Sequence, residues 1–165
     1  MTPLDALLSA VKRIREPRLF VTERGYQGQL AAEIDKLIDG ETGGIERLLV
    51  EQEYQKTAKV HGITLRPDII VHIPFDRGVS PSRQHDNHLV ILLKLSASKK
   101  KAEEDFAKLE TICSVLHYPI GAFVNIASLD LWLPKYRRRS HEHFVLHEIA
   151  VHLKNAEPKI LVSSK

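Results

Sequence analysis

A single charged side chain interrupts the most apolar stretch of this sequence. Residues 89–95 contain six aliphatic side chains and one lysine, Lys94. A short run rich in Val, Ile and Leu predicts a buried β-strand, which we place at about 87–96. A lysine in such a strand costs free energy unless its ammonium group has a partner or a task. Lys94 is therefore the strongest constraint that the sequence sets on the fold.

Two further strand-like segments come before this strand, at roughly 45–56 and 66–73, and both are rich in Ile, Val and Leu. The polar segment 74–87 joins the second strand to the third, and we expect a long hairpin loop there. Strands that follow one another directly pair antiparallel when short connections join them. The three segments therefore predict an antiparallel meander.

Apolar residues at helical spacing predict three helices around these strands. Thr22 and Ser98 are suitable N-caps for the second and third helices, while Pro17 and Pro119 mark the ends of the first and third. The third helix leads into one more buried strand at 120–126. The three helices are expected at residues 3–15, 22–38 and 98–117.

The last part of the sequence leaves two interpretations open. Residues 141–153 fit a strand or a helix, and the turn-like segment 155–158 before 160–162 favours a terminal pair of strands. The whole order predicts an α/β fold in which a mixed sheet is flanked by helices. A chain of 165 residues suits one such domain with one core, so we expect a single domain over 1–165.

Composition narrows the expected environment. The chain has one cysteine, Cys113, so it cannot form an internal disulfide, which fits a reducing cytoplasm. Its first apolar run lacks the charge order of a signal peptide, and no apolar stretch approaches the roughly 20 residues that span a membrane. We therefore expect a soluble cytoplasmic protein without a membrane partner. A net charge of +3 neither requires nor excludes nucleic acid.

Asp68 and Lys94 are the first candidate site residues. Pro67 belongs at the start of a strand because it cannot donate a ladder hydrogen bond, so Asp68 follows near the strand end. Alternation places Asp68 on one face with Ile70 and His72, and Lys94 on one face with Leu92.

The segments RPDIIVH and HLVILLKLS, which contain Asp68 and Lys94, together resemble the motif of the PD-(D/E)xK nucleases, and the resemblance is strongest over residues 22–126. It implies a restriction-endonuclease-like fold, with an antiparallel three-strand meander in a mixed sheet. In that family the first acid and the following acid hold a divalent metal, and the lysine acts on the attacking water. Asp68 matches the first acid and Lys94 the lysine, whereas Leu92 occupies the position of the second acid.

Two helical carboxylates complete the candidate site. Asp105 lies within the apolar arc of the third helix at about 100° per residue, while Glu103 and Glu104 lie outside it. Glu23 begins the apolar stripe of the second helix. The resemblance implies that such helical acids approach the site, so Asp105 could replace the acid that is missing at Leu92. A buried acid needs a metal, a cation or several donors in any case.

The resemblance implies metal-dependent hydrolysis of DNA phosphodiesters, with Mg²⁺ or Mn²⁺ as cofactor. Its catalytic residues would be Asp68, Lys94, Asp105 and Glu23, and its metal ligands Asp68, Asp105 and Glu23. The alternative is an inactive nuclease-fold module that binds nucleic acid or a protein partner, because leucine cannot ligate magnesium. A toxin, immunity or mobile-element accessory protein is a third option without diagnostic residues. A homodimer stays open, because cutting both strands of a duplex needs two sites.

Each site residue also has a purely structural interpretation. Asp68 could cap a turn, Lys94 could protect an edge strand, and Asp105 could simply pair with Lys94 or Lys108. Glu23 could favour the helix dipole from the first turn.

Basic and histidine clusters supply further candidates. Phosphate contacts to DNA are expected from the basic runs and from two arginines in the hairpin loop, against a solvated surface as the alternative. The late histidines, including His143 and His147, lack an HExxH motif, and a polar face is the better interpretation. The DNA-binding candidates are Lys99, Lys100, Arg137, Arg138, Arg139, Arg77 and Arg83.

Overall fold

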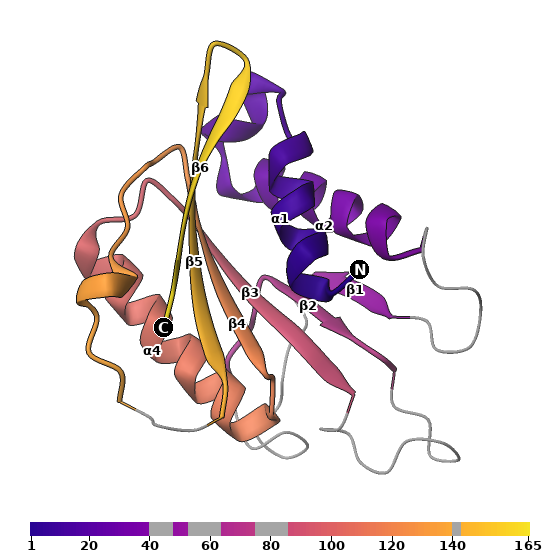
Figure 1. The fold of residues 1–165 in the computed structure, drawn as a ribbon, viewed down its shortest axis with the longest axis vertical. Coiled ribbons are helices and arrows are strands. Elements are labelled where there is room, and N and C mark those ends of the chain that lie inside the picture. The colour runs from indigo at the N-terminus through magenta and orange to yellow at the C-terminus, as the bar shows by residue number, and fades with distance from the viewer. Residues whose placement is uncertain (40–47, 53–63, 75–85, 140–142) are drawn as a thin grey trace.

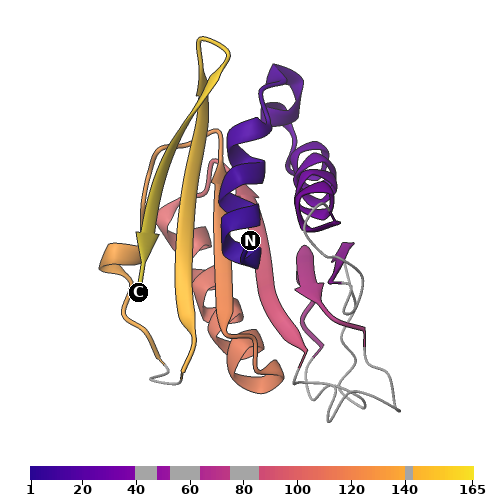
Figure 2. The same ribbon diagram turned by 45° about the vertical axis from the view of Figure 1, so that its right-hand side comes forward.

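A six-stranded mixed sheet with helices on both faces forms the body of the protein (Figure 1; Figure 2). The strands lie across the sheet in the order in which they occur in the chain. The computed structural model describes residues 1–39, 48–52, 64–74, 86–139 and 143–165. Its elements are α1 (Pro3–Arg13), η1 (Pro17–Val21), α2 (Glu23–Asp39), β1 (Leu49–Gln52), β2 (Ile69–His72), β3 (Asn87–Leu95), α4 (Lys99–Leu116), β4 (Ile120–Ile126), η2 (Leu133–Lys135), β5 (Val145–Lys154) and β6 (Glu157–Ser164).

The direction of the strands changes at β3. β1 pairs antiparallel with β2, and β2 pairs antiparallel with β3. β3, β4 and β5 then run parallel to one another, and β5 and β6 close the sheet as an antiparallel hairpin. Parallel neighbours need a crossover connection, and α4 supplies it between β3 and β4. This connection places α4 against one face of the sheet.

The side chains of the sheet separate into two cores. The odd-numbered residues of β3, such as Leu89 and Ile91, pack beneath α1 and α2. Its even-numbered residues Val90 and Leu92 pack beneath α4 with Phe106. Alternation along a strand explains this division, and burial on both faces explains why β3 is so apolar. No helix in the described ranges is both long and apolar enough to cross a bilayer.

The expected helix starts are present. The Thr22 hydroxyl accepts a hydrogen bond of 3.2 Å from the Gly25 N–H, and the Ser98 hydroxyl accepts one from Lys101 N–H. A Cβ at position 25 would lie 2.7 Å from the Thr22 Oγ1, so glycine there leaves room for the cap. The first helix is shorter than expected, because it ends at Arg13 and Pro17 begins the separate turn η1.

The strand interpretation of the tail is the right one, since β5 pairs with β6 from His147 to Lys154. Asn155 and Ala156 both have positive φ in the two-residue turn between them, as the favoured hairpin turns require. The second strand is shorter than the expected 66–73, because β2 covers only Ile69–His72. The ends of the first strand cannot be compared with expectation, because 45–47 and 53–56 lie outside the described residues. The same holds for most of the hairpin loop, including Arg77 and Arg83, and for His141.

Gly121 allows α4 to approach β4 closely. A Cβ at this position would lie 2.9 Å from the Cys113 Sγ and 3.0 Å from the Leu146 Cδ2. Gly121→Ala should therefore lower the free energy of unfolding by about 1–3 kcal/mol, as overpacked cores do. Urea denaturation measures this change.

Gly28→Ala is the matched control, because a Cβ there would meet nothing within 4 Å. Alanine in a helix is favoured over glycine by about 1 kcal/mol, so this variant should be more stable than the natural protein. Equal destabilisation by both changes would contradict the packing that we describe.

Candidate functional site

Asp68 lies just before β2 and joins that strand to β3. Its carboxylate Oδ2 accepts a hydrogen bond of 2.7 Å from the Leu93 N–H, and its own N–H donates to the Ile91 carbonyl at 3.2 Å. The side-chain amide of Gln27, on α2, donates to the Asp68 carbonyl at 3.0 Å. The ladder of β2 starts at Ile69, so the Asp68 side chain takes the place of a backbone acceptor for β3.

Glu23 meets Lys94 at the end of β3. Its Oε1 lies 3.4 Å from the Lys94 Nζ, and its Oε2 accepts from the Leu95 N–H at 3.4 Å. Both distances are long for such contacts, so the carboxylate is loosely held. Burial lowers the pKa of Lys94, but the negative charges of Glu23, Asp105 and Asp68 together raise it by more, so the net shift is upward. Lys94 therefore stays charged, and its partner is the acid of the first turn of α2.

Asp105, on α4, interacts electrostatically with both Asp68 and Lys94. The side chain is 3% exposed, as its position in the apolar arc predicts. Its Oδ1 accepts from the Lys108 Nζ at 2.6 Å, whereas its Oδ2 is buried and has no hydrogen-bond partner within the described ranges. Asp105 thus pairs with Lys108, as its structural interpretation expects, and its Oδ2 stays without a partner within the described ranges.

Glu23, Asp68, Lys94 and Asp105, which we call the Asp68 cluster, interact electrostatically. The pKa of Asp68 is raised to about 6, mainly by burial, although the hydrogen bond from Leu93 acts to lower it. The charges of Glu23 and Asp105 also act to raise this pKa, whereas the charge of Lys94 acts to lower it. Three acids, from α2, the start of β2 and α4, therefore interact electrostatically with one lysine, and the pKa of the partly buried Asp68 is raised.

Leu92 occupies the position two residues before Lys94, where the motif has its second acid. It is 5% exposed and packs in the core beneath α4, beside Phe123 on β4. A leucine offers no oxygen, so the side-chain direction that a second strand acid would use is apolar. In the part of the chain that the structure describes, no three His, Cys, Asp or Glu side chains are grouped to hold a metal ion.

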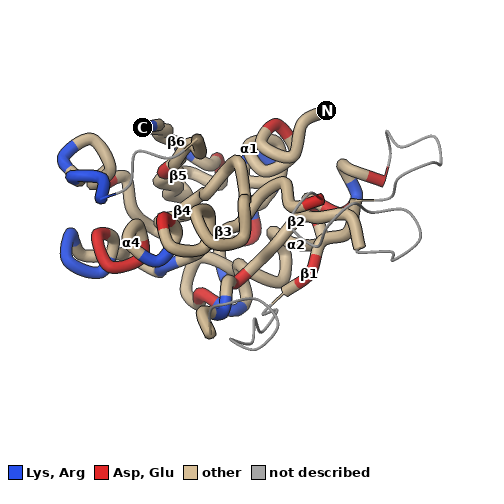
Figure 3. Tube along the Cα trace, turned by 90° about the horizontal axis from the view of Figure 1, so that it is seen from below, with Lys and Arg blue, Asp and Glu red and all other residues tan. Residues whose placement is uncertain are grey.

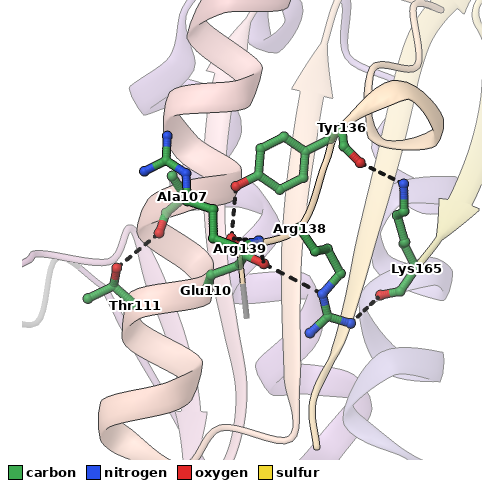
Figure 4. Close-up of polar contacts among 7 residues, drawn as sticks. All are labelled: Ala107, Glu110, Thr111, Tyr136, Arg138, Arg139 and Lys165. Carbon is green, nitrogen blue, oxygen red and sulfur yellow. Dashed lines mark hydrogen bonds and ion pairs between the residues drawn. The ribbon is translucent and has the colours of Figure 1, made fainter. Parts of the chain in front are cut away.

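The arginine run has two different roles in the structure. Arg137 and Arg139 are exposed, but the Arg138 side chain is only 17% exposed. The Arg138 guanidinium pairs with Glu110 at 3.5 Å and donates to the Lys165 carbonyl at 3.3 Å (Figure 4). It also stacks over the Phe144 ring at 4.5 Å. We therefore treat Arg138 as part of the framework and not as a surface contact.

Two buried acids were not predicted from the sequence. Glu110 accepts from the Tyr136 hydroxyl at 2.8 Å and from the Arg139 N–H at 3.0 Å. Its spacing of four residues from Phe106 was a usable signal for the inner face of α4. Glu148 accepts from the N–H groups of Trp132 and Leu133, both at 2.7 Å, and burial raises its pKa. It could only be found once β5 was known to be a strand.

The remaining candidates stay separate from the Asp68 cluster. Lys99 forms an ion pair of 3.8 Å with Glu103, and Lys100 is exposed. His143 and His152 are exposed, while burial lowers the pKa of His147 on β5. These contacts favour a polar surface for the histidines.

The chain matches no protein-family model, and comparisons with curated proteins and with solved structures return no match.

The raised pKa of Asp68 predicts a dependence of stability on pH. The folded pKa of about 6 is above the ordinary value of 3.8, so protonated Asp68 adds to the free energy of unfolding. This contribution is fully present below pH 4. Its contribution, up to about 3 kcal/mol, is lost as pH rises through 6. Asp68→Asn keeps an acceptor for Leu93 but cannot ionise, so it should become more stable relative to the natural protein from pH 4 to pH 7.

Urea denaturation of both proteins at several pH values measures this difference, and groups that titrate in both proteins cancel. Two parallel curves of unfolding free energy against pH would show that Asp68 has an ordinary pKa.

Proposed function

We propose that this protein is a PD-(D/E)xK-like nuclease that acts on the phosphodiesters of DNA with a weakened metal site. The observation that carries the proposal is the Asp68 cluster, in which Glu23 contacts Lys94 at 3.4 Å and acids from two further elements interact with it electrostatically. Carboxylates that repel one another favour the binding of a divalent cation, because the cation relieves their repulsion.

The arrangement of the elements supports the resemblance. A helix that carries an acid at its start, α2, precedes three antiparallel strands, and α4 leads to a strand parallel to the third. The two motif residues Asp68 and Lys94 come from neighbouring strands, and they interact across the strand pair. A restriction-endonuclease-like fold therefore remains our interpretation of this sheet.

The donor set fits magnesium chemically, because Mg²⁺ prefers carboxylate oxygens and keeps several waters. Asp68 and Asp105 would hold the ion, with Glu23 as the third acid. The buried Asp105 Oδ2 has no other partner within the described ranges, which leaves it available as a ligand. Since no third ligand group is in place there, we expect weak binding. A bound magnesium ion lowers the pKa of water and offsets the charge of the phosphate.

The residues of this chain supply the remaining functions. Lys94 stays protonated beside Glu23, so it can stabilise negative charge that develops on a phosphate. Asp68, with its pKa at about 6, is ionised above that pH and ready to bind a cation. The Leu93 N–H fixes the orientation of the Asp68 carboxylate.

An inactive nuclease-fold module is the second candidate function. Leu92 favours it, because this side chain is buried in the apolar core beneath α4 and occupies the place of a strand acid. Such a module would bind nucleic acid or a protein partner without cleavage.

A nuclease assay with Mg²⁺ or Mn²⁺ on plasmid and single-stranded DNA separates the two functions. We expect slow cleavage by the natural protein, and a loss of at least a hundredfold in Asp68→Asn and in Asp105→Asn, because each removes a charge from the metal site. Leu92→Glu should increase the rate at least tenfold, since it restores an acid on the face of Lys94.

Glu104→Gln is the control variant, because this acid of α4 is exposed and faces away from the cluster; it should cleave at the natural rate. No cleavage by the natural protein, with a gain in Leu92→Glu, would establish the inactive module instead. Undiminished cleavage in both Asp68→Asn and Asp105→Asn would refute the assigned chemistry.

A further inference from the structure

A second site lies on the opposite flank of α4 from the Asp68 cluster. Seven residues separate Glu103 from Glu110, so they share one side of the helix, while Asp105 lies roughly 140° away from Glu110. Next to Glu110, the segment 137–139 borders a pocket of about 710 Å³ that is lined by Arg137, Arg138, Arg139 and Lys165. Figure 3 shows basic segments gathered beside α4 and away from β1.

A buried network holds this segment in place. Glu110, 3% exposed on α4, accepts from the Tyr136 hydroxyl and from the Arg139 N–H, and it pairs with the Arg138 guanidinium (Figure 4). The Lys165 Nζ donates to the Tyr136 carbonyl at 2.6 Å. The backbone on both sides of Arg138 is thereby fixed before any ligand arrives, which lowers the entropic cost of binding.

The charges in this region are not balanced. Glu110 pairs with Arg138, and neither the Arg137 nor the Arg139 guanidinium forms an ion pair in the described part of the chain. The Arg138 Nη2 is buried and lacks a hydrogen-bond partner there, although a guanidinium offers five donors. Arginines that border one pocket and have unused donors favour a phosphate group, which accepts several hydrogen bonds at once.

Acids set the limit of the site. A neighbouring pocket of about 340 Å³ is lined by Lys100, Arg137 and Arg139 together with Tyr136, Glu103 and Glu104. The two glutamates there oppose an anion, and Figure 4 shows that the Arg139 side chain extends over α4 toward Ala107 while Arg138 points toward Lys165. The larger pocket, whose lining holds no acid among the residues that the structure describes, is therefore the better place for an anion.

We propose that the pocket of Arg137, Arg138, Arg139 and Lys165 binds a phosphate group, with Arg137 and Arg139 as the contacting cations and Glu110 and Arg138 as positioning residues. The phosphate belongs either to a nucleic-acid strand or to a free phosphate compound. This site needs no metal and does not depend on the nuclease activity of the Asp68 cluster.

The test is binding in EDTA, so that the Asp68 cluster contributes no metal-dependent affinity. A fluorescent 12-nucleotide single-stranded DNA is titrated by anisotropy at several salt concentrations, and inorganic phosphate and pyrophosphate are titrated by calorimetry. The double variant Arg137→Gln/Arg139→Gln should lose at least tenfold in affinity for the ligand that binds. For DNA, the slope of log affinity against log salt concentration should become shallower by the equivalent of about two phosphate contacts.

The control is Lys135→Gln/Lys159→Gln, which removes the same charge from exposed positions outside the pocket. It should keep the natural affinity, and both double variants should keep the natural urea midpoint. Preference for DNA over pyrophosphate identifies a nucleic-acid strand as the source, and the reverse identifies a free phosphate compound. Equal losses in the two double variants, or no loss in the arginine variant, would overturn the site.

Discussion

The packing of α4, which connects β3 to β4, against one face of the sheet is the constraint on which both candidate sites depend. Parallel strands can only be joined by a crossover, and this crossover must cover one face of the sheet. Gly121 lets the helix approach closely, and the apolar side of α4 is buried as a result. The two flanks of the helix then present Asp105 to β2 and β3, and Glu110 to the segment after η2.

Charge placement at the Asp68 cluster opposes stability. Burial is the main reason that the pKa of Asp68 is raised to about 6, and the negative charges of Glu23 and Asp105 act in the same direction. Structural ion pairs in proteins are usually balanced, and surplus charge of one sign is more typical of sites that bind a ligand of the other sign. Glu110 on α4 and Arg138 in the segment after η2 show the balanced arrangement.

Much of this fold could be predicted from local patterns, whereas the pairing of charges could not. The apolar run of β3 and the caps Thr22 and Ser98 are signals within a few residues. β5 was ambiguous because residues 148–151 are buried on both faces of the sheet, so that no alternation marks the strand. Arg138 looked like part of an exposed run, since its partner Glu110 is distant in sequence.

The bond between the Leu93 amide and the Asp68 carboxylate couples the chemistry of a side chain to the backbone of the central strand. The amide proton of Leu93 sits in the middle of the sheet, yet its electronic environment changes whenever Asp68 gains a proton or a ligand. In an NMR spectrum this one resonance would act as an internal gauge of the site, readable without a substrate and without any change to the sequence.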